Sequence, residues 1–444
     1  MEDLTMNNLS VDFTEKIGKI KPMHAVNNGP VGSRGRGSAA YFEEIGIPYA
    51  RNHDASFCAS YGGSHTVDVH AVFPNFDADE NDPASYDFDL TDRYCQKIEE
   101  VGTKVYYRLG SKIEHEPKKY GTLVPPDFGK WARICEHIIR HLTEGWANGH
   151  RFDIEYWELW NEPDLGTECW QGTGEEFCEL FCVAFKHLKS CFPHLKIGGP
   201  AFTQIHPYKI DEALFYEYLR KYDIKLDFFS AHGYRKVPIR YANDAYEIRE
   251  ILDREGQEGC EIHLNEWNYI KGWKGDEFTY SVESIIGNKG ASFALGAMLG
   301  AQKSPMDVFM YYDARPCVYN GFFDMYTYRK LPTFYSFKMF GDMYRLGGEV
   351  ESTTDDEERF YIGAAEGEGG KLIALTYFVD DDTAPDAPAA LKINGVKAGA
   401  KLDFLLSDSE NELKLVRTEY MGEGESCFYL NFKNYDRIYI KIEE

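Results

Sequence analysis

Paired cysteines are missing from this sequence of 444 residues. It contains ten cysteines, but no two form a CxxC pair and they do not reach the density of a disulfide scaffold. They are Cys58, Cys95, Cys135, Cys169, Cys178, Cys182, Cys191, Cys260, Cys317 and Cys427. We therefore expect most of them to be reduced, buried and inert.

Long apolar runs and leader segments are also missing. No stretch approaches the roughly 20 apolar residues that a membrane-spanning helix needs. The start, "MEDLTMNNLSVDFTEKIGKI", lacks both the basic residues and the apolar core of a signal peptide. These absences favour a cytoplasmic protein that is not bound to a membrane.

Positive charge is scarce, because 48 Lys and Arg stand against 73 Asp and Glu and give a formal net charge of -25. A chain with this charge repels phosphate groups, which argues against nucleic acids and anionic membranes as partners. Aromatic residues, in contrast, make up 15% of the chain, more than a core alone requires. The composition favours an uncharged ligand, with aromatic rings as a platform for a sugar or a base.

Motifs for metal and phosphate binding are absent as well. The segments "EHE" at 114–116 and "IHLNE" at 262–266 lack the HExxH spacing, and adjacent residues of a strand face opposite sides. The glycine-rich segment 29–38, "GPVGSRGRGS", lacks the lysine of a phosphate-binding loop and the full dinucleotide pattern. We therefore predict no metal and no cofactor, and we interpret 29–38 as a flexible loop over a binding cup.

Eight short apolar runs, separated by amphipathic segments, follow one another within residues 18–346. They are 21–28, 48–53, 104–110, 156–163, 195–201, 227–234, 261–268 and 307–314. Three of the intervals contain helical patterns, at 127–146, 174–191 and 281–302. Repeated strand-then-helix units in this number predict an α/β fold, a (β/α)8 TIM barrel.

The pattern changes at about residue 347. Short alternating strands follow, with turn-rich spacers such as "EGEGG" and "DDDTAPDAPA" between them. They are 359–367, 371–380, 404–409, 412–420, 426–434 and 437–444. We predict an accessory β-sandwich domain over 347–444, joined by an N-terminal strand from 8–17.

Most of the predicted barrel strands end in polar residues, and two of them carry a glutamate there. Glu162 lies in "YWELWNEP" and Glu266 in "EIHLNEWN", on the fourth and seventh strands. The carboxyl ends of barrel strands surround one cup, so these side chains can flank a bound substrate. Glycoside hydrolysis needs such a pair, one group to protonate the leaving oxygen and one to meet the anomeric carbon. A separation of about 5–5.5 Å between the two carboxyl groups implies that one of them is a nucleophile and that the reaction retains the anomeric configuration. A wider separation admits a water molecule and implies inversion of that configuration.

The segments "WELWNEPDL" and "EIHLNEWN", with "PYARNH" before them and "DFFSAHGY" between, resemble the clan A glycoside hydrolases. The order of the matches is most similar to family 39, which includes β-xylosidases and α-L-iduronidases. This resemblance implies that Glu162 is the acid/base and Glu266 the nucleophile. It also implies that Asn161 hydrogen-bonds the sugar 2-hydroxyl, an interaction that strengthens in the transition state.

The resemblance extends to further residues of the cup. His53 corresponds to a histidine of the innermost sugar site, and Tyr312 lies near the place of an aromatic platform under the sugar. His232 and Tyr234 correspond to a segment whose tyrosine lies near the nucleophile. There its hydroxyl would hold Glu266 ionised and correctly aimed.

Two tryptophans, Trp267 and Trp273, follow in the loop of the seventh strand, and we expect both to contact substrate. The sequence also departs from the family pattern. Asn265 stands where relatives often have Thr or Ser, and "YYDAR", with Asp313 and Arg315, replaces a Trp-centred segment. These departures leave the catalytic pair intact, but the sequence does not identify the sugar of the substrate.

We predict a retaining, exo-acting, β-xylosidase-like glycosidase that acts on neutral oligosaccharides by a two-step double displacement. Two alternatives keep this mechanism: another sugar (an arabinoside, galactoside or glucoside), or transfer of the glycosyl unit to another sugar. An alternative of a different class is a non-catalytic carbohydrate-binding barrel. Family relatives are often multimeric, which leaves a homo-oligomer open.

Overall fold

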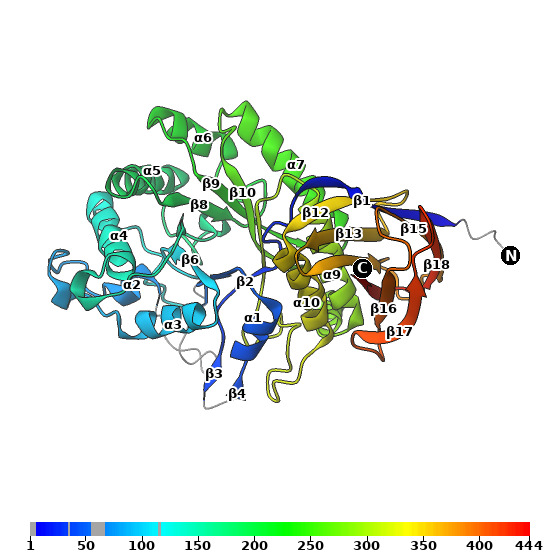
Figure 1. Ribbon diagram of the computed structural model, residues 1–444. Coiled ribbons are helices and arrows are strands. Elements are labelled where there is room, and N and C mark those ends of the chain that lie inside the picture. The colour runs from blue at the N-terminus through cyan, green and yellow to red at the C-terminus, as the bar shows by residue number, and fades with distance from the viewer. Residues whose placement is uncertain (1–5, 34–35, 55–66, 114–116) are drawn as a thin grey trace.

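The computed structural model describes residues 6–33, 36–54, 67–113 and 117–444. Within them, eight parallel strands close into a barrel, and a mixed sheet of nine strands lies beside it (Figure 1). The predicted fold class, a TIM barrel with a β-sandwich, is therefore confirmed.

The strands of the barrel form where the eight apolar runs predict them. They are β2 (Ala25–Asn27), β5 (Tyr49–Arg51), β6 (Lys104–Leu109), β7 (Tyr156–Leu159), β8 (Lys196–Phe202), β9 (Phe228–Arg235), β10 (Glu261–Tyr269) and β11 (Val308–Tyr311). Nearly every residue in them is buried, because helices cover the outside and side chains fill the inside. Continuous apolar runs form these strands for that reason.

Helices surround the barrel and connect its strands. They are α1 (Ala39–Ile45), α2 (Val69–Val72), α3 (Asp89–Glu100), α4 (Phe128–Thr143), α5 (Gly174–Cys191), α6 (Glu212–Lys221), α7 (Ile239–Arg254), α8 (Gly275–Ile285), α9 (Asn288–Gln302) and α10 (Pro332–Leu346). Short 3-10 turns occur at Pro83–Ser85, Trp146–Asn148 and Pro163–Leu165.

One helix prediction is wrong in detail, because segment 281–302 belongs to two helices. The helical conformation is interrupted at Gly287, whose extended backbone (φ -108°, ψ -172°) directly precedes α9. The two helices then approach so closely that a Cβ on Gly290 would lie 2.6 Å from the Ser284 carbonyl oxygen. Glycine at position 290 permits this close approach, which the apolar pattern alone does not reveal.

The second sheet contains the N-terminal strand and the C-terminal region. Its strands are β1 (Asn7–Lys19), β12 (Gly348–Thr354), β13 (Phe360–Gly367), β14 (Gly370–Tyr377), β15 (Ala387–Asn394), β16 (Lys401–Ser407), β17 (Lys414–Tyr420), β18 (Ser426–Phe432) and β19 (Arg437–Glu443). β1 pairs antiparallel with β12 and parallel with β15. The sequence prediction missed β12 and β15, and β15 begins inside a segment interpreted as a spacer. A separate two-stranded ribbon, β3 (Gly32–Ser33) with β4 (Arg36–Gly37), lies in the segment interpreted as a loop.

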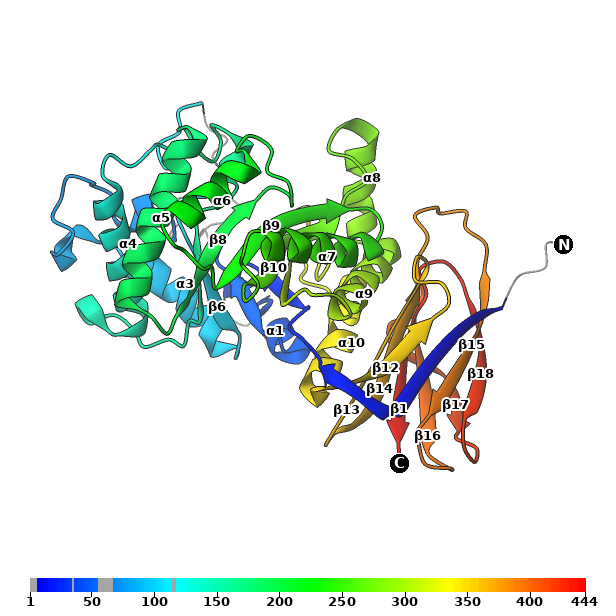
Figure 2. The ribbon, with the colours of Figure 1, turned by 90° about the horizontal axis from the view of Figure 1, so that it is seen from above.

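The sandwich packs against the barrel through α9 and α10, which contact β13 and β14 (Figure 2). Arg437 of β19 is buried in this interface. Its guanidinium donates to the Pro332 carbonyl oxygen at 2.9 Å and to Asn288 Oδ1 at 2.6 Å. The two parts are therefore joined by specific buried hydrogen bonds as well as by apolar packing.

Two further expectations from the sequence concern the cysteines and membrane-spanning helices. The nine cysteines within the described ranges are free and most are buried, as predicted, and Cys58 lies outside these ranges. Among the described residues, no helix has the length and apolar character that crossing a membrane requires.

Candidate active site

The backbone at the end of β7 turns sharply and projects two polar side chains at the barrel mouth. Trp160 (φ 76°) and Glu162 (φ 47°) both have left-handed conformations, which are uncommon for residues with a side chain. Backbone hydrogen bonds from Trp160 to Leu109 (2.6 Å) and from Glu162 to Ala201 (2.8 Å) hold the turn. Pro163 then begins a 3-10 turn directly after Glu162, which lies three residues beyond the end of β7 at Leu159. Strained backbone that is fixed in this way is typical of functional sites.

Glu266 reaches the same place from β10. Its Oε1 accepts a hydrogen bond from Arg51 Nη1 at 2.9 Å, and its Oε2 accepts one from the Tyr234 hydroxyl at 2.9 Å. Both oxygens are therefore held by donors, one from β5 and one from the neighbouring strand β9. This arrangement fixes the direction of the carboxylate and favours its ionised form.

His232 of β9 lies between the two glutamates. Its Nδ1 is 2.7 Å from Glu162 Oε1 and 3.5 Å from Glu266 Oε2. One oxygen of each carboxyl group lies within 4.8 Å of the other. This separation is close to the roughly 5–5.5 Å of a nucleophile and its acid/base partner, and it is shorter than the roughly 6.5–9.5 Å of the two carboxyl groups in an inverting enzyme.

Arg51 of β5 connects the residues of the site. Besides Glu266, it donates to Asn161 Oδ1 at 2.7 Å, to Asn27 Oδ1 at 3.1 Å and to Glu158 Oε2 at 2.7 Å. All of these side chains are buried. A guanidinium has several donors in a fixed plane, so one residue can align both Glu266 and the asparagine beside Glu162.

Glu158 is a second carboxylate on β7 that the sequence prediction did not identify. Besides Arg51 it accepts a hydrogen bond from Ser230 Oγ at 2.6 Å and another from the Asn265 side chain. Asn265, which departs from the family pattern, therefore holds Glu158 rather than substrate. The signal in the sequence was a charged residue inside each of two apolar runs, "PYARNH" and "YWELW".

Burial raises the pKa of both catalytic candidates. The pKa of Glu162 rises to about 8, because the Asp164 carboxylate adds to the effect of burial. The pKa of Glu266 rises only to about 7, because His232 and Arg51 oppose the effect of burial. Glu162 therefore keeps its proton at a pH where Glu266 has lost its own, which suits an acid paired with a nucleophile.

Several buried polar atoms in the cup have no hydrogen-bond partner. Among the described residues these include Asn161 Nδ2, His53 Nδ1 and His232 Nε2. Burial lowers the pKa of both imidazoles, so each is neutral near pH 7. His53 Nε2 lies 3.4 Å from Glu266 Oε1. Unpaired donors at such positions are costly unless a ligand satisfies them, which suits recognition of a polyhydroxylated substrate.

The rim of the cup carries Tyr312 and Trp273. The Tyr312 hydroxyl donates to Asp54 Oδ2 at 2.5 Å, and Arg315 also bonds that oxygen, at 2.9 Å. Arg315 Nε donates to Asp313 Oδ2 at 2.6 Å, so the two unfamiliar residues pair with each other. Trp273 is 55% exposed, and its ring lies edge-on to that of Tyr234 with centroids 4.9 Å apart.

The prediction for Trp267 is wrong. Its side chain is fully buried, and its ring stacks on Phe309 with centroids 4.2 Å apart and an interplanar angle of 5°. Adjacent residues of a strand face opposite sides, so Trp267 faces the helices when Glu266 faces the cup. It stabilises the barrel wall and does not contact substrate.

Our prediction contains no metal site, but the described residues include two groupings of potential metal ligands. They are Glu136 with His187 and Cys191, and Glu162 with His232 and Glu266. Arg51, however, already supplies a cation to Glu266, which opposes a second positive charge there. The segment 114–116 lies outside the described residues, and His263 pairs with Glu261 at 3.2 Å.

Comparison with known proteins agrees with this geometry. A model described as "Glycosyl hydrolases family 39" matches residues 52–258, which contain the strand end with Glu162. Residues 52–258 are therefore similar to glycoside hydrolase family 39. A β-xylosidase of Caldicellulosiruptor saccharolyticus is 28% identical to this chain over 204 residues, 43% of this chain and 37% of the relative. A β-xylosidase of Geobacillus stearothermophilus is 26% identical over 222 residues, 46% of this chain and 40% of the relative.

The matched segment spans about two fifths of the length of these two curated relatives. Two solved structures are similar to nearly the whole chain, the barrel and the sandwich together. A glucosidase from Croceicoccus marinus has a TM-score of 0.79 with 19% identity, covering 99% of both chains. A monomeric β-xylosidase from Caulobacter crescentus CB15 has a TM-score of 0.71 with 16% identity, covering 98% of this chain and 99% of that one. At this identity the structures show a shared fold.

Proposed function

We propose that this protein is a retaining, exo-acting glycosidase of the β-xylosidase type, with a neutral glycoside as substrate. The observation that carries the proposal is the pair Glu162 and Glu266, with one oxygen of each within 4.8 Å of the other. The proposal assigns catalysis to residues 18–346 and an accessory role to the sandwich of 347–444, which strand 8–17 joins.

The proposed reaction has two steps. In the first, Glu162 protonates the leaving oxygen while Glu266 bonds to the anomeric carbon and the glycosidic bond breaks. In the second, Glu162 takes a proton from water, the water oxygen bonds to the anomeric carbon, and Glu266 is released. Arg51 and Tyr234 support the charge on Glu266 at the beginning and end of this cycle.

Substrate contacts are assigned to the side chains that surround the pair. The unpaired amide of Asn161 suits a donor to the sugar 2-hydroxyl, and His53 and His232 provide further polar atoms. Tyr234 aligns the nucleophile, while Trp273 and Tyr312 provide aromatic surface at the rim. These assignments rest on burial, position and free hydrogen-bonding capacity.

A screen of aryl pentosides and hexosides of both anomers tests the function. We expect cleavage of one sugar series, and NMR of the first product should show the anomeric configuration of the substrate. Binding of sugars without cleavage of any member would favour the non-catalytic barrel. Glycosyl transfer at high acceptor concentration, in place of hydrolysis, would favour the transglycosidase.

A further inference from the structure

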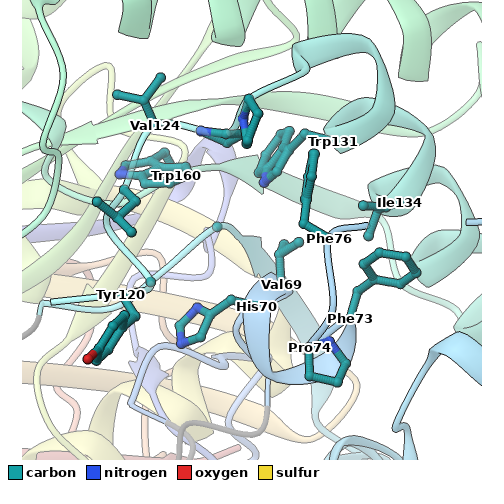
Figure 3. Close-up of a pocket in the computed structure, with 15 residues that line it drawn as sticks. Val69, His70, Phe73, Pro74, Phe76, Tyr120, Val124, Trp131, Ile134 and Trp160 are labelled. Atoms are coloured by element: carbon teal, nitrogen blue, oxygen red, sulfur yellow. The ribbon is translucent and has the colours of Figure 1, made fainter. Parts of the chain in front are cut away.

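A pocket of about 410 Å³ lies beside the cup, between α2, Gly110, residues 120–126 and the first turns of α4. Figure 3 shows the rings of Phe76, Trp131 and Trp160 around it, with His70 and Tyr120 at its edge. Its volume lies in the range of roughly 300–1,000 Å³ that is usual for small-molecule sites. None of its lining residues is among the substrate contacts proposed above.

The lining of this pocket is apolar. No Lys, Arg, Asp or Glu is among the described residues that line it, and three prolines, Pro74, Pro125 and Pro126, cannot donate a backbone hydrogen bond. A sugar ring would bury several hydroxyl groups here with few partners, at a cost for each unpaired group. The pocket therefore fits a hydrocarbon or aromatic group better than a second sugar.

The pocket is joined to the catalytic centre through the end of β7. Trp160, which forms part of its wall, directly precedes Asn161 and Glu162 in the chain. The Trp160 ring is fixed, because its Nε1 donates to the Cys169 carbonyl oxygen at 2.9 Å. Asn161 bonds Arg51 on the cup side, so one strand end contributes to both places.

Two large hydrophobic residues at the pocket edge are accessible. Leu123 is 50% exposed and Tyr120 is 68% exposed. Apolar side chains gathered at the entrance of an apolar hollow are typical of a ligand site. A group that enters here would lie close to the strand end that presents the acid/base.

We propose that this pocket binds the apolar part, aromatic or alkyl, of the leaving group of a glycoside. This inference rests on the proposed function, in which Glu162 protonates the leaving oxygen. The leaving alcohol then extends from Glu162 toward Trp160 and places its hydrocarbon part in the pocket. The preferred substrates are accordingly glycosides of aromatic or long-chain alcohols.

The test compares phenyl and 2-naphthyl glycosides of the sugar that the screen identifies. The two leaving groups differ little in acidity, so their ratio of kcat/KM reports the additional apolar ring. We expect a ratio of about ten in favour of naphthyl, from the area that one ring buries. Leu123→Asp and Phe76→Ala should each bring this ratio close to one. Leu415→Asp, at a similarly exposed leucine of β17 (54%), is the matched control and should retain it.

An equal rate on both substrates, or a high ratio that both pocket variants retain, would overturn the inference and leave the glycosidase function intact. Absence of all cleavage is instead the failure of the proposed function. In that case, calorimetric titration of 2-naphthol into the full-length protein tests whether the pocket binds an aromatic group. Binding that Leu123→Asp abolishes and Leu415→Asp retains supports it, and absence of binding to the unmodified protein overturns it.

Discussion

Arg51 is shared by two buried carboxylates, and this sharing governs the nucleophile. Glu158 and Glu266 both bond its guanidinium, at 2.7 and 2.9 Å, so neither has the whole positive charge. Arg51 keeps Glu266 oriented, while burial keeps the pKa of Glu266 as high as about 7, although His232 and Arg51 lower it. A carboxylate held by an undivided arginine would be more easily ionised and less nucleophilic.

The first prediction concerns Glu158→Gln. Without the second carboxylate, Arg51 acts on Glu266 alone, and the pKa of Glu266 falls by about one unit. Because the reaction needs ionised Glu266, the acid limb of kcat/KM against pH should move to lower pH. Glu261→Gln, at the other end of the barrel, is the control. An unchanged acid limb in Glu158→Gln would show that Glu158 only supports the fold.

The pH profile of the unmodified enzyme is the second prediction. Activity needs Glu266 ionised and Glu162 protonated, so kcat/KM should rise through about pH 7 and fall above about pH 8. The two limbs belong to the coupled pair as a whole. With an activated aryl substrate, Glu162→Gln should lose the alkaline limb. Persistence of that limb in the variant would assign it to another group.

At the scale of elements, the loop between β10 and α8 brings Trp273 over the cup, while β10 itself places Trp267 in the barrel wall. Tyr269 at the end of β10 and Lys289 of α9 both bond to the sandwich. The Tyr269 hydroxyl donates to Asp380 Oδ1 at 2.7 Å, and Lys289 pairs with the same oxygen at 2.7 Å. The loop that carries Trp273 therefore begins at a fixed point.

The third prediction is that Trp273→Ala raises KM for the glycoside about tenfold with little change in kcat. An exposed ring at the rim can stack on a sugar face, which contributes to binding of both the substrate and the transition state. Steady-state kinetics measures the two constants separately. Tyr420→Ala removes an exposed ring of the sandwich and should change neither. A fall in kcat with constant KM would place Trp273 in the chemical step.

The sequence predicted elements well where one physical pattern decides them. Apolar runs gave the eight barrel strands, because such strands are buried on both faces. The break between α8 and α9 depends on close contacts at Gly290, which periodicity does not contain. β15 starts with Ala387 and Pro388, residues that favour a turn when read alone, and its pairing with β1 and β18 decides the outcome.

Prediction of the site residues from the sequence had the same limit. Glu162 and Glu266 stand out because a carboxylate at a strand end has no role in packing. Glu158 lies inside an apolar run, and its role emerges only when the strands bring Arg51, Ser230 and Asn265 to it. Trp267 was misplaced because an aromatic residue beside a catalytic candidate suggests stacking, whereas strand alternation turns it outward.

At the scale of the whole molecule, the sandwich covers the outer helices of the barrel and shields α9 and α10. Arg437 is the buried cation of this interface, and burial lowers its pKa to about 10. Its side chain satisfies acceptors on both α9 and α10.

The fourth prediction is that Arg437→Met destabilises the protein by about 2 kcal/mol, because buried acceptors lose their donor. The midpoint of thermal unfolding should fall by several degrees. Arg417→Met, at a half-exposed arginine of β17, should change it little. An equal midpoint for the two variants would mean that these hydrogen bonds contribute nothing to holding the sandwich on the barrel.

The division of roles between Glu162 and Glu266 is the central claim, and azide rescue of the two glycine variants tests it most directly. With an activated aryl glycoside, Glu266→Gly should form a glycosyl azide of inverted configuration, because azide replaces the nucleophile in a single displacement. Glu162→Gly should form an azide of retained configuration, because azide attacks the glycosyl-enzyme intermediate. NMR of the two products gives both configurations, and reversed configurations, or no rescue of either variant, would contradict the assignment.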